Sequence, residues 1–164
     1  MRKLKLEKLL NLIVLAIQFA FAFFVIFCFY MFSALYEYEG GFTGFIGLTL
    51  FQPMAGAFFA GLTIVFCFIL GLPLRIHNRI SYWWRTKTYF ALIIILFGFC
   101  SLISSFFFSN EVYLEEREVM HTAPNQILWI TGWFFTAFGC LHLFPPANFR
   151  EKINRIFSNS ITSN

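Results

Sequence analysis

The sequence predicts an all-α membrane protein, a bundle of four transmembrane helices in a single domain. Of its 164 residues, 59% are hydrophobic and only 12% are charged, which is about half the charged fraction of a typical soluble domain. The charged residues leave four gaps along the chain, each longer than the roughly 20 residues that a helix needs to cross hydrocarbon. The spans predicted in these gaps are residues 9–35, 54–74, 89–109 and 126–144.

Helix is the conformation expected for all four spans. Lipid offers the backbone no hydrogen-bond partner, so each span must satisfy its own N–H and C=O groups. A β-barrel would need strands of about ten residues in which apolar and polar residues alternate, and the apolar run from Leu9 to Leu35 shows no such alternation. That run is also longer than the roughly 7–15 apolar residues of a signal peptide, so we expect it to be retained.

The first span carries two amide side chains on one face. Asn11 and Gln18 are seven residues apart, and this spacing places two residues on the same side of a helix. We expect Gln18 to lie inside the hydrocarbon and to form a hydrogen bond across helices, which contributes about 0.6–2 kcal/mol. Contact with a ligand is the alternative role. No span contains Asp, Glu, Lys or Arg, which argues against proton or ion pumping because such pathways usually need them.

The segment that joins the first two spans, residues 40–52, is apolar but contains four glycines. Each glycine costs a helix interior about 1 kcal/mol relative to alanine, so a continuous helix is not expected here. The segment is predicted to be an interfacial loop, and a segment that dips back into the membrane is the alternative.

The loop between the second and third spans is basic and aromatic. Each basic residue near an anionic lipid surface contributes about 1 kcal/mol of binding, and aromatic rings prefer the depth of the headgroups. The predicted headgroup contacts are Arg75, Arg79, Trp83, Trp84, Arg85 and Lys87. A topology determinant with aromatic anchors is the second interpretation of the same residues.

Stripes of small or hydroxyl-bearing residues run along the later spans. In lipid, helices associate by close packing, so these stripes are expected to face the interior of the bundle. They comprise Gly98, Ser101 and Ser105 on the third span, and Gly132, Thr136 and Cys140 on the fourth. Small residues also recur at a four-residue spacing in the second span, at Gly56, Ala57, Ala60 and Gly61. Packing is the predicted role, and a dimer interface is the alternative.

The loop between the third and fourth spans is acidic. Glu115, Glu118 and His121 follow a three-residue step, which would align them on one side of a helix. Glu37 and Glu39 in the other loop could add oxygen ligands. These residues form a candidate metal site, but a single short motif has a high false-positive rate. A solvated acidic loop without metal or cofactor is therefore the prediction.

The basic residues predict how the chain is oriented in the cell membrane. Every Lys and Arg except Arg117 lies before the first span, in the middle loop or after the last span. Short loops rich in Lys and Arg stay in the cytoplasm, so both termini are predicted to be cytoplasmic. After the last span, residues 148–158 place apolar residues at helical spacing between basic ones, which fits an amphipathic helix on the inner leaflet.

The two halves of the chain have related patterns. Phe27-Cys28 recurs as Phe99-Cys100, Gly56 as Gly132, and Cys67 with Pro73 as Cys140 with Pro146. Near-constant offsets predict two duplicated helical hairpins that insert the same way up. Chance matching in a sequence with 26 phenylalanines is the alternative.

The sequence contains no recognisable catalytic or phosphate-binding motif. The predicted function is therefore non-enzymatic and depends on contacts with proteins or lipids, as in an accessory subunit, an immunity-type protein or a scaffold. One alternative is a small permease or channel for an uncharged solute, with a polar cavity near Gln18, Thr63, Ser101 and Thr136. The other is a membrane enzyme with a metal in the outer loop. The expected partners are the bilayer, its anionic headgroups, and another membrane protein or a second copy, but not nucleic acid.

Overall fold

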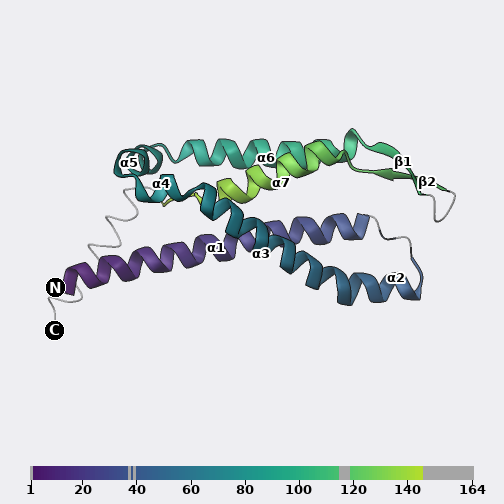
Figure 1. The fold of residues 1–164 in the computed structure, drawn as a ribbon, viewed down its shortest axis with the longest axis horizontal. Helices are drawn as coiled ribbons and strands as arrows, with labels where there is room; N and C mark the ends of the chain where they lie inside the picture. The colour runs from purple at the N-terminus through teal and green to yellow at the C-terminus, as the bar shows by residue number, and fades with distance from the viewer. Residues whose placement is uncertain (1, 37, 39, 115–118, 146–164) are drawn as a thin grey trace.

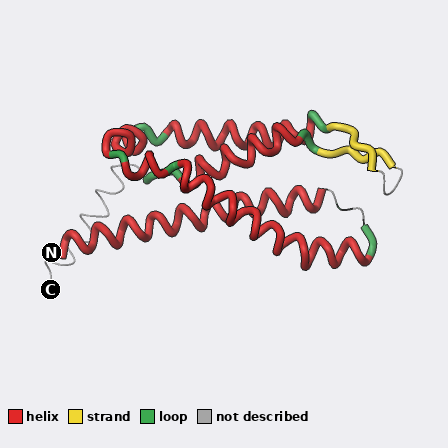
Figure 2. Tube along the Cα trace, in the orientation of Figure 1, coloured by secondary structure: helices red, strands yellow, loops and turns green. Residues whose placement is uncertain are grey.

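The computed structural model describes residues 2–36, 38, 40–114 and 119–145, and the side chains of residues 9–36, 38, 40–109 and 123–145. The chain forms four long helices that run along one axis (Figure 1). Two short helices, α4 (Leu72–Ile76) and α5 (Asn78–Thr86), lie at one end, which we call the basic end. A β-hairpin lies at the opposite end, the hairpin end (Figure 2).

The long helices alternate in direction. They are α1 (Arg2–Tyr36), α3 (Gln52–Leu70), α6 (Tyr89–Phe107) and α7 (Gln126–Leu141). Three segments, Leu9–Tyr36, Phe42–Leu70 and Tyr89–Phe107, are long and apolar enough to cross a membrane, which supports the predicted membrane class. α7 is apolar too, but its 16 residues extend about 24 Å at 1.5 Å per residue.

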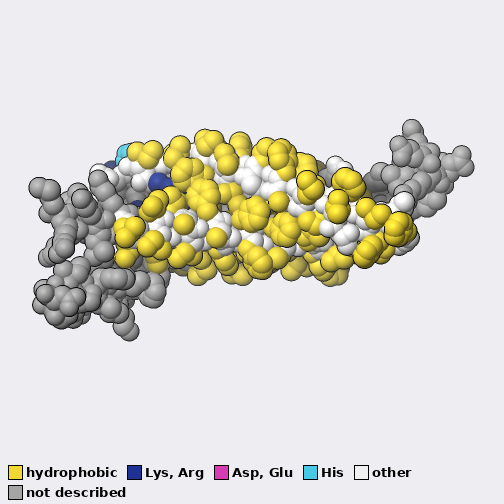
Figure 3. All heavy atoms as spheres, turned by 90° about the horizontal axis from the view of Figure 1, so that it is seen from below, with side chains coloured by type: hydrophobic (Ala, Val, Ile, Leu, Met, Phe, Trp, Pro, Cys, Tyr) yellow, Lys and Arg dark blue, Asp and Glu magenta, His cyan; other side chains and the backbone are white. Residues whose placement is uncertain are grey.

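The surface between the two ends is hydrophobic. One face of the molecule is covered by apolar side chains along its length, and Lys and Arg appear only near the basic end in this view (Figure 3). Large residues such as Phe58, at 64% exposure, and Leu96, at 62%, point outward. Soluble monomers rarely expose apolar patches of this extent, whereas lipid is a suitable solvent for them.

The glycine-rich segment is helical, so the predicted loop is wrong. α2 (Phe42–Ile46) leads into a π-helical turn, η1 (Gly47–Phe51), which continues directly into α3. Only Gly40 and Gly41, with φ near 83° and 84°, use the left-handed conformation that favours glycine. A glycine inside the helix costs about 1 kcal/mol, but each backbone group left unbonded in lipid costs several. The helix therefore persists through the glycines.

α7 is the most central of the long helices and packs against α1, α3 and α6. Its buried residues are Gly132, Trp133, Thr136, Ala137, Gly139, Cys140 and Leu141. A Cβ on Gly132 would lie 2.7 Å from the carbonyl oxygen of Gly98 and 2.7 Å from the backbone nitrogen of Leu102. The backbones of α6 and α7 thus approach closely, and the predicted inward-facing stripes of these two helices are confirmed.

α3 ends at Leu70, earlier than the predicted end of the second span at residue 74. The next residue, Gly71, has φ −86° and ψ 1°, a conformation open to any residue, so its backbone does not require glycine. The ring of His142 fills the space that a side chain on Gly71 would occupy, and it would overlap any Cβ there. His142 is fully buried, with Nε2 3.3 Å from the carbonyl oxygen of Cys67. Pro73 consequently lies in the first turn of α4.

A β-hairpin joins α6 to α7. β1 (Asn110–Leu114) pairs antiparallel with β2 (Val119–Ala123), and His121 lies opposite Val112. The helical alignment expected around His121 is therefore wrong, because this residue belongs to an extended strand. The hairpin is fixed to α6 at its base, where the backbone N–H of Asn125 donates to the carbonyl of Ser105 at 2.8 Å.

Candidate functional site

α5 lies across the basic end of the bundle. Figure 1 views this helix along its axis while the long helices lie in the plane of the picture. Its exposed residues include Arg79, Tyr82 and Trp83, its buried residues are Ser81 and Trp84, and Lys87, which follows the helix directly, is exposed as well. The indole N–H of Trp84 donates to the carbonyl of His142 at 2.8 Å, which fixes α5 to the chain that leaves α7. The outer face of α5 is therefore cationic and aromatic.

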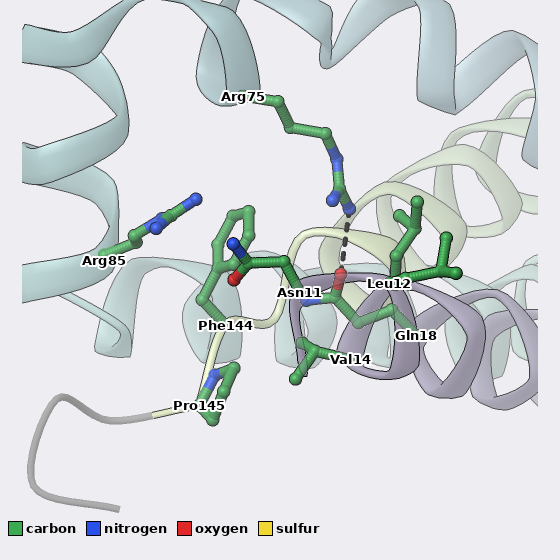
Figure 4. Close-up of a pocket in the computed structure, with 9 residues that line it drawn as sticks. Asn11, Leu12, Val14, Gln18, Arg75, Arg85, Phe144 and Pro145 are labelled. Carbon is green, nitrogen blue, oxygen red and sulfur yellow. Dashed lines mark hydrogen bonds between the residues drawn. The ribbon is translucent and has the colours of Figure 1, made fainter. Parts of the chain in front are cut away.

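A pocket of about 280 Å³ lies behind α5, between α1, α4 and the chain that follows α7 (Figure 4). The polar side chains that line it come from three helices. They are Asn11 and Gln18 from α1, Arg75 from α4 and Arg85 from α5, and they surround the ring of Phe144. The two amides predicted to share one face of the first span thus line one cavity.

Gln18 and Arg75 form the fixed wall of the pocket. The amide nitrogen of Gln18, which is 5% exposed, donates to the carbonyl of Leu143 at 2.7 Å, so the predicted long-range hydrogen bond is present. Nη2 of Arg75 donates to Oε1 of Gln18 at 3.0 Å and to the carbonyl of Leu141 at 2.9 Å. Because a guanidinium can only donate hydrogen bonds, the Gln18 oxygen must face Arg75.

The two arginines share one aromatic ring. The guanidinium carbons of Arg75 and Arg85 lie 5.1 Å and 5.0 Å from the centroid of Phe144. Burial and the neighbouring charge of Arg85 lower the pKa of Arg75, but arginine remains protonated at neutral pH. The described residues that line the pocket include no acidic side chain. The arrangement concentrates positive charge and can bind an anion.

Arg75 also has a buried donor without a partner. Its Nε is inaccessible to solvent and forms no hydrogen bond to any of the described residues. A buried donor left unbonded costs about 1–3 kcal/mol, and more when it is charged. Because this nitrogen is inaccessible, it is not a donor that a molecule in the pocket can reach.

The structure divides the six residues predicted to contact lipid headgroups. Arg79 and Trp83 on α5 and Lys87 just after it are exposed, whereas Arg75 and Arg85 line the pocket. The sixth residue, Trp84, belongs to α5 but is buried. Sequence reasoning missed Phe144 entirely, and only its aromatic character at the last position of the predicted fourth span could have singled it out.

The predicted outer metal site lies mostly outside the described residues. This is the case for Glu37, Glu39, Glu115 and Glu118, and for the amphipathic segment predicted at 148–158. His121 is placed by its backbone in β2. Within the described part of the chain, no group of three or more His, Cys, Asp or Glu residues could hold a metal ion.

The polar residues expected to line a permease cavity take part in separate contacts. The hydroxyl of Thr63 accepts a 2.8 Å hydrogen bond from the indole N–H of Trp133, beside a pocket of about 310 Å³ with mostly aromatic walls. Thr136 lies in the contact between α6 and α7, against Gly98, and Ser101 is buried on α6. Gln18 lies at the basic end.

Comparison of this chain with known protein families, with curated proteins and with solved structures found no match.

Proposed function

We propose that the chain is a non-enzymatic membrane protein with four spans that binds anionic lipid headgroups through its basic end, as a scaffold or accessory subunit. The observation that carries this proposal is the position of α5 across the end of the apolar bundle, with Arg79, Trp83 and Lys87 exposed. A helix with a polar cationic face and aromatic residues is suited to the membrane interface. Each basic residue there contributes about 1 kcal/mol of attraction to anionic lipid.

The fourth span of this proposal is α7. It runs antiparallel to α6 over its length, from the Asn125–Ser105 hydrogen bond at the hairpin end to the contact of Gly139 with Ala91 at the basic end. A helix paired in this way with a membrane-crossing helix crosses the same membrane. Its short length is compatible with this role because the chain that follows it, including Phe144, is buried inside the basic end.

We propose in addition that the basic end faces the cytoplasm, as the distribution of Lys and Arg favours, and that the two hairpins arose by duplication. α1 and α6 start at the basic end, and α3 and α7 return to it (Figure 1). Matched positions share their exposure, since Cys67 and Cys140 are buried while Cys28 and Cys100 are exposed. These agreements support a parallel repeat.

Lipid enrichment around the reconstituted protein tests the proposed function. The full chain would be placed in phosphatidylcholine vesicles that contain a minor fraction of phosphatidylglycerol, then extracted into polymer-bounded discs whose lipids are measured by mass spectrometry. We expect enrichment of phosphatidylglycerol around the wild type. The double variant Arg79→Gln with Lys87→Gln should lower it, by up to about fivefold per charge removed.

The matched control is Arg117→Gln, which removes the one basic residue between the last two spans. It should leave the enrichment unchanged. Equal lipid composition inside and outside the discs, or equal losses in both variants, would contradict the proposed function.

A further inference from the structure

We infer that the pocket formed by Asn11, Gln18, Arg75, Arg85 and Phe144 is a specific binding site for the phosphate group of a single inner-leaflet phospholipid. This inference rests on the proposed function for the orientation of the basic end. It goes beyond that function because it assigns one stoichiometric site to the side chains that line the pocket (Figure 4), and not to the residues exposed on α5.

The donors in the pocket suit a phosphate. Guanidinium groups bind phosphate oxygens through short, charge-assisted hydrogen bonds, often in pairs. Nη2 of Arg75 is occupied by Gln18 and Leu141, so the side chain is held in place beside the cavity. An anion in the pocket would reduce the mutual repulsion of Arg75 and Arg85.

The framework around these donors is already formed. Gln18 is buried and bonded on both sides of its amide, and Phe144, at 5% exposure, supports both guanidinium groups. Binding therefore does not have to order the wall of the pocket, which lowers the entropic cost of association. The amide of Asn11 lies at the same cavity and can bond a phosphate oxygen or a glycerol hydroxyl.

The position of the pocket favours a lipid over a free anion. Asn11 lies two positions after Leu9, where the apolar part of α1 begins, and lipid phosphates lie at this edge of the hydrocarbon. Leu12, which is 62% exposed, lines the same pocket and continues into the apolar surface of α1. A cavity of about 280 Å³ accepts a headgroup but is small for a whole ligand of drug size, so the acyl chains would lie outside along α1.

The test titrates the purified full chain in a neutral detergent with dihexanoyl phosphatidic acid, and measures the midpoint of thermal unfolding. A ligand that binds only the folded state raises this midpoint as its concentration exceeds Kd. We expect saturable stabilisation by phosphatidic acid, and much weaker effects from dihexanoyl phosphatidylcholine and from inorganic phosphate at the same concentration.

Two variants locate the site and one controls for charge. Arg85→Gln removes a pocket cation without breaking the bonds between Arg75 and Gln18, and should weaken binding by about tenfold or more, because it removes a charge-assisted hydrogen bond to the phosphate. Asn11→Leu keeps the charge and fills the pocket from an exposed position, and should also abolish saturable binding. Arg79→Gln removes the same charge from the outer face of α5 and should preserve Kd.

The outcomes separate the pocket from the proposed function. Equal stabilisation by inorganic phosphate would overturn the assignment to lipid. Equal weakening by Arg79→Gln, or unchanged binding in both pocket variants, would overturn the pocket and leave the general enrichment of anionic lipid in place. Saturable binding to the pocket without enrichment of anionic lipid in the discs would refute the proposed function and leave the pocket assignment in place. Unliganded unfolding midpoints of the variants identify any that fail to fold.

Discussion

The first helical hairpin, α1 with α3, and the second, α6 with α7, run in the same direction along the molecule, but their helices pack together in different ways. In the second hairpin, α6 and α7 meet backbone to backbone, with Gly98 and Gly132 in direct contact. In the first, aromatic rings separate α1 from α3, as in the pairs Phe19–Phe68 at 5.3 Å and Tyr30–Phe59 at 6.2 Å between centroids. The second hairpin is therefore the tightly packed part of the molecule, and the first hairpin leaves the cavities.

The frame is α6 with α7, because small residues allow close packing without voids. The first hairpin joins this frame through a shared apolar core that includes Ile26, Ala60 and Leu141. Two polar contacts, Thr63 with Trp133 and Gln18 with Leu143, and the packing of His142 against Gly71 add to it. Spacing by large side chains leaves room near the helix ends. Both the basic pocket and the aromatic pocket beside Thr63 are lined by α1 or α3 together with α7 or the chain after it.

The largest expected effect tests whether the hairpins are parallel. If both halves insert the same way up, the two connections between their helices lie on one side of the membrane, outside the cell. A membrane-impermeant maleimide applied to whole cells should label Glu39→Cys and Glu116→Cys. It should label Asn78→Cys or Ser160→Cys only after the membrane is opened.

The wild-type chain, which already has four cysteines within its predicted spans, provides the background for this labelling experiment. Labelling of Ser160→Cys from outside intact cells would mean that α7 does not cross the membrane. The parallel comparison between the hairpins would then fail.

The next effect tests the difference in how closely the two helices of each hairpin pack together. Gly132→Ala places a methyl group 2.7 Å from backbone atoms of α6, and overpacking of this kind costs about 1–3 kcal/mol of the free energy of unfolding. Gly61→Ala is the matched control in α3, because a Cβ there meets nothing within 4 Å. It should be neutral or stabilising by up to about 1 kcal/mol, through helix propensity.

The measurement is unfolding of the purified chain by increasing dodecyl sulfate in mixed micelles, followed by loss of helical circular dichroism. Similar losses of stability in both variants would show that the two hairpins are equally packed. The closer packing of the second hairpin would then make no difference to the free energy of unfolding.

Local periodicity was sufficient to predict some of these features. The face shared by Asn11 and Gln18, and the inward stripes of α6 and α7, depend only on residue spacing along one helix. The helical course of Gly44 and Gly47 was missed because propensity measured in water undervalues backbone bonding in lipid. The prediction from residue propensity therefore failed in a segment whose conformation depends on the surrounding solvent.

The candidate site was only partly predictable. Arg75 and Arg85 were recognised as basic residues beside the membrane, but not as two walls of one pocket. Their convergence depends on the end of α3 at Leu70, where the ring of His142 from the other half of the chain packs against Gly71, and on Phe144, which the sequence did not single out. The spacing of residues along the chain does not reveal contacts between distant segments. The pocket could therefore be recognised only in the folded structure.

The smallest effect tests the polar link between the hairpins in the apolar core. Thr63→Val removes the acceptor for the buried indole N–H of Trp133, and hydrogen bonds between helices in membranes contribute about 0.6–1.7 kcal/mol. We expect a loss of this size in the free energy of unfolding, measured by the same dodecyl sulfate titration, and less than that of Gly132→Ala.

Two further variants isolate the hydrogen bond from packing. Thr63→Ser keeps the hydroxyl and should lose less stability than Thr63→Val. Adding Trp133→Phe to Thr63→Val removes the donor that was left unbonded, so the double variant should lose less than the sum of the two single losses. Strict additivity would show that the hairpins are held together by shape alone, and that the Thr63–Trp133 bond contributes nothing to joining the first hairpin to the frame.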